Sequence, residues 1–420
     1  MAEQVAVTVR AQIADGRVGA VTRLLSNRSA GIANEDLRLA QLPRVHFARV
    51  FVVESATLRS GETIPASLVY MADVDGSLAR HLRDLVENAA PGVDKLFGLC
   101  VGYPAQPDDA RRIAWLRSHT LPATAYYVHC VGRSVERVSN ETRLYGCVQD
   151  ILDRGEIATN GATPAQIRTR IRDAVLRRAD FSWITDPPHG PGLCRLVRDC
   201  VQLVGVVALL LIAAPVLVPV ALLWLVLVRV IEQRDSQEEG SPDQNHVDDV
   251  RRYEDLGAQN PFTGVGEIKP GLIRLVTIRV ALAGLNFACR HLYSRDNLAG
   301  IDTIHFARWV LLDNNRRLIF ASSYDGSLES YMDDFISQVA WGINLVFGNG
   351  AGFPRTRWLI LGGARDEIRY KHYLRRHQIP TRVFYSAYPH RTVVNHDKFT
   401  TVHAGIASDT ADPDEWTKLL

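Results

Sequence analysis

A long apolar stretch separates two halves of the chain that alternate between apolar and polar positions. It runs from Val201 to Val228 and reads VQLVGVVALLLIAAPVLVPVALLWLVLV, without a charged residue. About 20 apolar residues suffice to cross the hydrocarbon core of a bilayer, so the stretch predicts a membrane segment. Pro215 and Pro219 lie near its middle and favour a kink, because proline removes a backbone donor. Two arrangements remain open: a kinked single span, and a hairpin that returns to the face it entered.

A second apolar segment, Gly271 to Tyr293, is interrupted by Arg274, Arg279 and Arg290. This pattern predicts a helix that lies at the membrane interface or is partly buried, rather than a second span. Both of these arrangements are open.

The two halves share sequence motifs in corresponding places. DGSL, FG-x-x-x-G-[YF]-P and HFAR each occur once on either side of the apolar stretch. Their first residues are Asp75 and Asp325, Phe97 and Phe347, and His46 and His305. The first two pairs have the same offset, and the third has an offset nine residues larger. We interpret these recurrences as an internal duplication.

In the second half, the pattern predicts strands at HFARWVLLD, LIFASSY, RWLILGG and TRVFYSAYP, and helices at LESYMDDFISQVAWGINLVF and ARDEIRYKHYLRRHQI. The first half offers matching segments at HFARVFVVE, ASLVYMADV, the helix after DG, TAYYVHCVG and ETRLYGCVQDILD. The order is β-β-α-β-α-β, or β-α-β-β-α-β if one edge is misread. Either order describes a ferredoxin-like unit.

A single ferredoxin-like unit leaves one sheet face bare, and a related partner can cover it. The predicted fold class is therefore α+β: two ferredoxin-like repeats packed sheet to sheet, with an inserted membrane-anchoring helical segment. Repeats that pack together must lie on one side of a membrane, which favours the hairpin over the crossing. The predicted divisions are 1–40 (N-terminal extension), 41–160 (first repeat), 161–200 (basic helical connector), 201–230 (membrane segment), 231–270 (acidic linker), 271–295 (amphipathic helix), 296–405 (second repeat) and 406–420 (tail).

Charge and composition narrow the functional classes. The formal net charge of the 420 residues is +2, which argues against a nucleic-acid binder. The arginines before the apolar stretch and the acidic run EQRDSQEEGSPDQNHVDD after it indicate a cell-membrane protein whose soluble domains face the cytoplasm. Six cysteines without a C-x-x-C pair indicate reduced thiols, and no metal site is expected. The strong preference for arginine over lysine is typical of a GC-rich bacterial genome. Motifs of hydrolases, metalloproteases, kinases and P-loop proteins are missing from the sequence.

Two strands carry an arginine on an otherwise apolar face, and such a charge needs a carboxylate partner. Arg308 has Asp325 and Asp334 within reach in the sequence, and Arg49 has the corresponding Asp75 and Asp84. One interpretation is an internal ion pair that fixes a helix on its sheet. The other is a clamp for an anionic substrate.

His46 and His305 begin their strands, and each is either a hydrogen-bonded structural residue or a ligand of a cofactor. Imidazole is the one axial-ligand type that the two halves offer at equivalent positions. The segment LGGARDE, at residues 361–367, places two glycines directly before a predicted helix. It is either a plain strand-to-helix turn with Asp366 as an early acidic residue, or a site whose free N–H groups bind an anion.

Paired ferredoxin-like units resemble the dimeric α+β-barrel superfamily, and within it the dye-decolourising peroxidases, which hold a haem between duplicated units. That family carries G-x-x-D-G, whereas this chain has ADVDG and SSYDG, which both lack the first glycine. The resemblance implies haem as cofactor and a distal acid at Asp325 or Asp75. With Arg308 these are the candidate catalytic residues, and His305 and His46 are the candidate cofactor-binding residues.

These patterns together predict a membrane-anchored protein that binds or transforms a small hydrophobic molecule. As an enzyme it would be a peroxidase-like, haem-dependent oxidoreductase. The alternative is a non-catalytic, membrane-associated interaction scaffold. The expected partners are the lipid bilayer and a small-molecule ligand, nucleic acid is not expected, and assembly into a homo-oligomer is left open.

Overall fold

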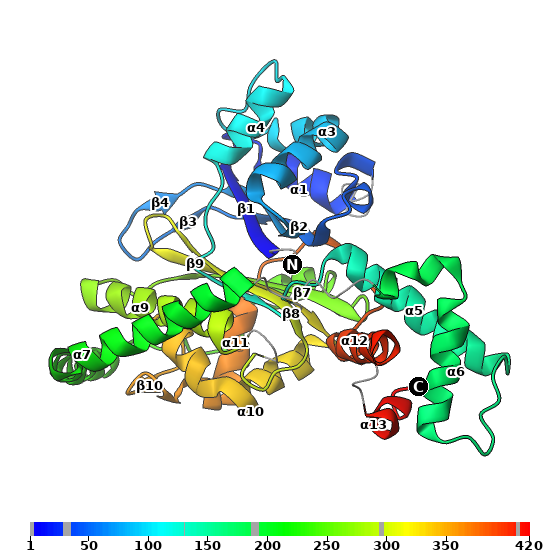
Figure 1. Ribbon diagram of the computed structural model, residues 1–420. Helices are drawn as coiled ribbons and strands as arrows, with labels where there is room; N and C mark the ends of the chain where they lie inside the picture. The colour runs from blue at the N-terminus through cyan, green and yellow to red at the C-terminus, as the bar shows by residue number, and fades with distance from the viewer. Residues whose placement is uncertain (1–3, 28–34, 130, 186–192, 294–297, 409–411) are drawn as a thin grey trace.

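The computed structural model describes residues 4–27, 35–129, 131–185, 193–293, 298–408 and 412–420. The chain is a mixed α+β protein built on two four-stranded antiparallel sheets, which confirms the predicted class (Figure 1). Residues 186–192 of the predicted basic connector lie outside the described residues.

The two sheets exchange their fourth strands. The first has the order β1 (Gln4–Gln12), β5 (Ser67–Asp75), β2 (Val45–Val53), β12 (Val383–Ser386). The second has the order β7 (Gln259–Glu267), β9 (Arg317–Asp325), β8 (Ile304–Leu312), β6 (Ala125–Val128). Strand β12 therefore joins a sheet made by the first half, and β6 joins a sheet made by the second. Neither half can complete its sheet without the other.

The order within each half is β-α-β-β-α, which starts as the predicted β-α-β-β-α-β does. The last strand of each predicted unit, β6 or β12, joins the sheet of the other half, so neither predicted order is complete within one half. In the first half, α1 (Val18–Asn27) follows β1 and α3 (Leu78–Phe97) follows β5. In the second, α9 (Leu272–His291) follows β7 and α10 (Leu328–Phe347) follows β9. The structure thus places β1, predicted as extension, and β7 and α9, predicted as linker and separate helix, inside the two α+β units. Strand β7 was not predicted from the sequence, because it contains Pro261 and two glycines, which are unusual in strands. They are tolerated here because β7 lies at the edge of its sheet.

The prediction of one continuous strand at RWLILGG is wrong. The chain there forms two short strands, β10 (Thr356–Arg357) and β11 (Leu361–Gly362), which pair with each other. Trp358 and Leu359 between them have φ of 58° and 65°, a left-handed turn that interrupts the extended backbone.

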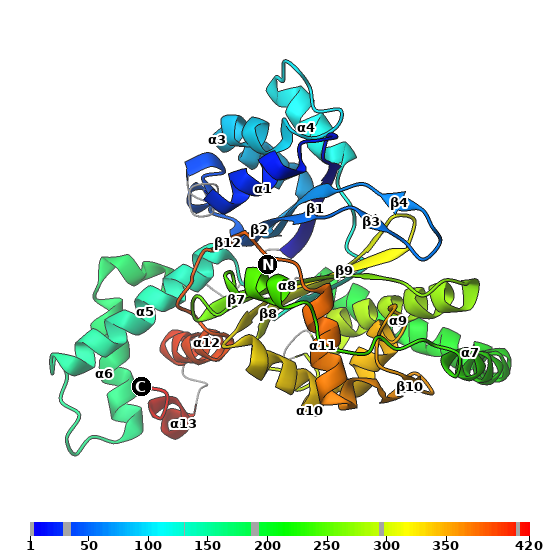
Figure 2. The same cartoon turned by 180° about the vertical axis from the view of Figure 1, so that it is seen from behind.

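The remaining elements extend these two units. They are η2 (Leu39–Gln41), β3 (Ala56–Thr57), β4 (Thr63–Ile64), α4 (Asp109–Ser118), α5 (Val135–Asp153), α6 (Pro164–Leu176), η3 (Ala179–Thr185), α8 (Gln244–Arg251), η4 (Gly363–Arg365), α11 (Glu367–His377), α12 (Val393–Ala407) and α13 (Pro413–Thr417). Helices α5, α6, α12 and α13 gather at the end of the molecule opposite the long helix α7 (Leu193–Glu232), around their own apolar core (Figures 1 and 2).

The inner faces of the two sheets pack against each other. Their shared apolar layer contains Phe51, Val53, Val69 and Met71 from the first sheet and Val310, Leu312, Ile319 and Ala321 from the second. The outer faces carry separate cores, one beneath α1 and α3 and the other beneath α9 and α10. Because strand side chains alternate between faces, each central strand contributes to both its outer core and the shared layer.

The long apolar stretch lies within one continuous helix, α7 (Leu193–Glu232), which includes Pro215 and Pro219. The favoured hairpin is therefore wrong, because no turn divides the helix. Among the described residues, α7 from Val197 onward and α9 are long and apolar enough to cross a membrane. The most apolar section of α7 is wholly unburied, whereas α9 is partly buried against the second sheet.

A buried histidine couples the stability of this fold to pH. The ring of His81 on α3 is 4% exposed, and its Nε2 lies 3.0 Å from the hydroxyl of Tyr70 on β5. Burial lowers the pKa of His81 from 6.5 to about 4. The folded ring therefore stays neutral at a pH where the unfolded ring is protonated.

We predict that His81→Gln flattens the pH dependence of unfolding. Between pH 7 and pH 5 the unfolded state of the wild type takes up a proton at this position and the folded state does not, so the free energy of unfolding falls. The contribution is about 2 kcal/mol at pH 5. Urea denaturation at both pH values measures it: the wild type should lose about that much more stability than the variant. Equal losses would contradict the assignment.

Candidate functional site

The structure joins the four predicted histidine and aspartate residues into two equivalent pairs. His46 Nε2 lies 3.0 Å from Asp75 Oδ1, and His305 Nε2 lies 2.7 Å from Asp325 Oδ1. Each histidine stands at a bulge, where the register of its strand shifts against the neighbouring strand. A bulge redirects a side chain, and here it turns each imidazole towards the aspartate that ends the adjacent strand.

The second oxygen of each aspartate accepts a hydrogen bond from the start of a helix. Asp75 Oδ2 accepts from the N–H of Val135 at 2.9 Å, at the first turn of α5. Asp325 Oδ2 accepts from the N–H of Val393 at 2.6 Å, at the first turn of α12. A carboxylate is favourable at a helix N-terminus, so each aspartate links a bulged strand to the helix beyond.

The rest of the repeated DGSL motif makes a strand-to-helix turn. Gly76 and Gly326 have φ of 99° and 83°, which residues with a Cβ rarely adopt. The hydroxyls of Ser77 and Ser327 then accept from the N–H groups of the third residues of α3 and α10, as N-caps. The motif that resembled a peroxidase fingerprint therefore has a complete structural role in both halves.

The histidines are enclosed by aromatic rings. His46 Nδ1 lies 2.8 Å from the hydroxyl of Tyr388, so both of its ring nitrogens are engaged. His305 packs against Phe47 and His396, with ring centroids 5.2 and 5.4 Å apart. Burial, followed by the nearby positive charges, lowers the pKa of His396 well below its usual value. His396 is therefore neutral.

These residues do not fit a haem. Asp75 and Asp325 each use both oxygens within the protein, and neither is free to act as a distal acid. His305 Nδ1 has no hydrogen-bond partner among the described residues, but the rings of Phe47 and His396 pack close on that imidazole. A macrocycle would have to displace this layer, so we assign the two histidines a structural role.

Arg308 crosses from the second sheet to the first. Its Nη2 pairs with Asp73 of β5, and its Nη1 donates to the carbonyl of Val7 at 2.6 Å and to Thr8 Oγ1 at 3.5 Å. The hydroxyl of Tyr126 also donates to Asp73, at 3.0 Å. The prediction that Asp325 or Asp334 pairs with Arg308 is therefore wrong. Arg308 points into the space between the sheets, where the opposite sheet supplies the carboxylate.

Arg49 makes the reciprocal crossing from the first sheet to the second. Its Nη1 donates to the carbonyl of Phe262 at 2.7 Å and to Thr263 Oγ1 at 3.2 Å. Its Nη2 donates to the carbonyl of Ser322 at 2.9 Å and to Ser323 Oγ at 2.7 Å. These acceptors occupy the places that Val7, Thr8 and Asp73 hold around Arg308.

Among the described residues, Arg49 bonds to neutral acceptors only, so the prediction that Asp75 or Asp84 pairs with it is wrong. Burial lowers the pKa of Arg49 to about 10; Asp73 opposes that shift and Arg308 adds to it. Both guanidinium groups are 3% exposed and have protein acceptors at each Nη atom. They therefore clamp the two sheets together rather than an anionic substrate.

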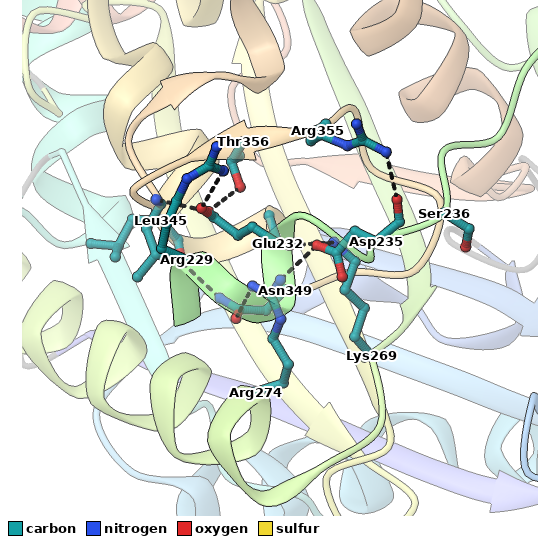
Figure 3. A network of polar contacts seen from close by, with 12 residues as sticks. Arg229, Glu232, Asp235, Ser236, Lys269, Arg274, Leu345, Asn349, Arg355 and Thr356 are labelled. Atoms are coloured by element: carbon teal, nitrogen blue, oxygen red, sulfur yellow. Dashed lines mark hydrogen bonds and ion pairs between the residues drawn. The ribbon is translucent and has the colours of Figure 1, made fainter. Parts of the chain in front are cut away.

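A buried polar network fixes the C-terminal end of α7 to the second half (Figure 3). Glu232 is fully buried, and its carboxylate accepts from the hydroxyl of Thr356 at 2.6 Å and from the N–H groups of Trp358 and Leu359 at 2.9 Å. The left-handed turn between β10 and β11 is thereby held around the end of the apolar helix.

Asp235, one turn further on, receives two cations in the same network (Figure 3). It accepts from Lys269 Nζ at 2.7 Å and from Arg274 Nη2 at 2.6 Å. Arg274 is 1% exposed, so its charge depends on this carboxylate for compensation. One of the arginines that interrupt the predicted amphipathic helix is thus an internal anchor for α7.

An apolar groove of about 860 Å³ lies between α7, α9 and α10. Its walls include Leu217 and Trp224 from α7, Gly284 from α9, and Trp341 and Gly342 from α10. Almost all of the lining surface is apolar, and the Trp224 indole N–H is already bonded to Thr277 Oγ1 at 2.9 Å. Sequence patterns could not reveal this groove, because it depends on where α7 lies relative to α10.

Comparisons with known protein families, with curated proteins and with solved structures found no match for this chain. The function is therefore argued from the geometry of these sites.

We predict that Arg308→Met lowers the free energy of unfolding by about 3–5 kcal/mol, because Asp73 stays buried without its guanidinium partner. The double variant Arg308→Met with Asp73→Leu removes both charges and should recover much of that loss. Urea denaturation of the three proteins measures the coupling. If the double variant is no more stable than Arg308→Met, the pair does not hold the sheets as described.

Proposed function

We propose that this protein is anchored in a membrane and binds a small hydrophobic molecule of acyl-chain character in the groove between α7, α9 and α10. The observation that carries the proposal is the groove itself, an apolar cavity walled on one side by an unburied apolar helix. Its volume is in the range of small-molecule sites, which are about 300–1,000 Å³.

The exposed surface of α7 supports the membrane anchor. Large apolar side chains such as Leu211, Ile212 and Val216 are 70%, 78% and 67% exposed. Soluble proteins rarely expose a continuous apolar patch larger than a few hundred Å². Covering each such side chain contributes about 1.5–3 kcal/mol, and bilayer hydrocarbon covers the whole helix at once.

The paired sheets support the proposed duplication. Each half presents the same element order, the same central strand pairing, the same bulged histidine with its aspartate, and a reciprocal arginine. We propose that the halves are copies of a ferredoxin-like unit, an architecture that resembles the dimeric α+β barrels. Their role here is to form a rigid body that carries the groove, facing the cytoplasm as the arginine distribution suggests.

A non-catalytic membrane scaffold is the second candidate. What favours it is that the candidate catalytic residues Asp325, Arg308 and Asp75 all form bonds within the protein and are not free for catalysis. The two candidates differ at the groove, because a scaffold has no need to retain a small hydrophobic molecule there.

Filling the groove should abolish ligand retention. Gly284 and Gly342 line it, and a Cβ added to either meets no atom within 4 Å. We predict that Gly284→Leu and Gly342→Leu each reduce retention of a fluorescent fatty acid at least tenfold, without loss of helix stability, because leucine favours helix more than glycine does. Retention is measured after gel filtration in a mild detergent.

Gly146→Leu is the matched control. Gly146 is exposed on α5, away from the groove, and also has open space around its Cβ position. This variant should retain the fatty acid as the wild type does. A wild type that retains none, or equal retention in all variants, would favour the scaffold.

A further inference from the structure

The same α+β body lies beside both ends of α7. At its C-terminal end, Glu232 is buried in the turn between β10 and β11. Near its N-terminal end, Arg198 and Gln202 share a polar cleft of about 380 Å³ with Gln4 and Tyr126, which belong to the two sheets. At 1.5 Å per residue the 40-residue helix is about 60 Å long, so the body follows it over a great length.

This attachment conflicts with a membrane crossing. The ends of a spanning helix emerge on opposite sides of a hydrocarbon core about 30 Å thick. A body that lies beside both ends would then itself lie within hydrocarbon. Arg279 is exposed on α9. Its charge would be costly at the centre of a bilayer, whereas in a single leaflet a long arginine side chain reaches the headgroups.

Other elements of the α+β body also expose large apolar side chains, as α7 does. Leu272 and Val280 on α9 are 73% and 65% exposed, and Trp341 on α10 is 49% exposed. In the β10–β11 turn, Trp358 and Ile360 are 39% and 42% exposed. Tryptophan is enriched at membrane–water interfaces. Val280, Trp341 and, in the turn, Leu359 also line the groove with α7, so α9, α10 and the turn present an apolar face around this groove.

We propose that α7 and this face lie in a single leaflet, with the whole body on one side of the membrane. The partner is thus a lipid surface, and the protein is monotopic. The inference rests on the proposed membrane association and adds the orientation. It also accounts for the lack of a polar face on α7: one side of the helix borders the apolar groove and the other borders hydrocarbon.

The accessibility of the two ends of α7 tests the orientation. Cys200 is an exposed native thiol near the N-terminal end, and Gln233 is exposed just after the C-terminal end. In a background with Cys130→Ser and Cys194→Ser, one variant keeps Cys200 and the other carries Cys200→Ser with Gln233→Cys. A membrane-impermeant maleimide is applied to sealed vesicles of each orientation. Both thiols should be labelled from the same side, and labelling from opposite sides overturns the proposal.

Quenching by lipids brominated on the acyl chain tests the face. In vesicles of phosphatidylcholine, such lipids should quench Trp341 and Trp358, so Trp341→Phe with Trp358→Phe should lower the quenchable fluorescence. Trp183→Phe is the control, because Trp183 packs against His403 in the core at the other end of the molecule. Equal quenching in the wild type and the double variant overturns the proposed face.

The two proposals fail separately. If the wild type does not float with phosphatidylcholine vesicles, the membrane association itself is wrong. If it floats but its two thiols react from opposite sides, the anchor stands and the monotopic arrangement is wrong.

Discussion

Two reciprocal arginines across the space between the sheets are the constraint on which the rest of the structure depends. Arg308 reaches Asp73 and the backbone of β1, and Arg49 reaches the backbone and hydroxyls of β7 and β9. A buried guanidinium is stable only when its donors are satisfied, and here each sheet supplies the acceptors for the other. The exchanged strands β6 and β12 strengthen this dependence, since each half completes the sheet of its partner.

This mutual dependence determines what the candidate residues can do. The histidines that resembled cofactor ligands are held by aspartates, and those aspartates also accept from the first N–H groups of α5 and α12. Residues with catalytic potential have become part of the framework that keeps the sheets closed. The proposed binding site lies instead on the outer side, where α7, α9 and α10 line an apolar groove and a buried network of charges holds the C-terminal end of α7.

Part of this architecture could be read from the sequence. The alternating residues of HFARWVLLD and LIFASSY correctly predicted β8 and β9, and the apolar periodicity that follows predicted α10. Strand β7 was missed because Pro261 and its glycines do not resemble a strand; its edge position makes them tolerable. The pairing of Arg308 with Asp73 and the groove beside Gly342 depend on packing between segments that are distant in the sequence. Local sequence patterns therefore could not predict them.

The central claim is that the two halves form one body without relying on the peptide connection between them. It is tested most directly by cutting the exposed loop at residues 239–242, between α7 and α8, through an inserted protease site. The account predicts that the two fragments stay together on gel filtration in mild detergent and separate only when denatured, because strands and arginines are shared. Fragments that separate under native conditions would contradict it.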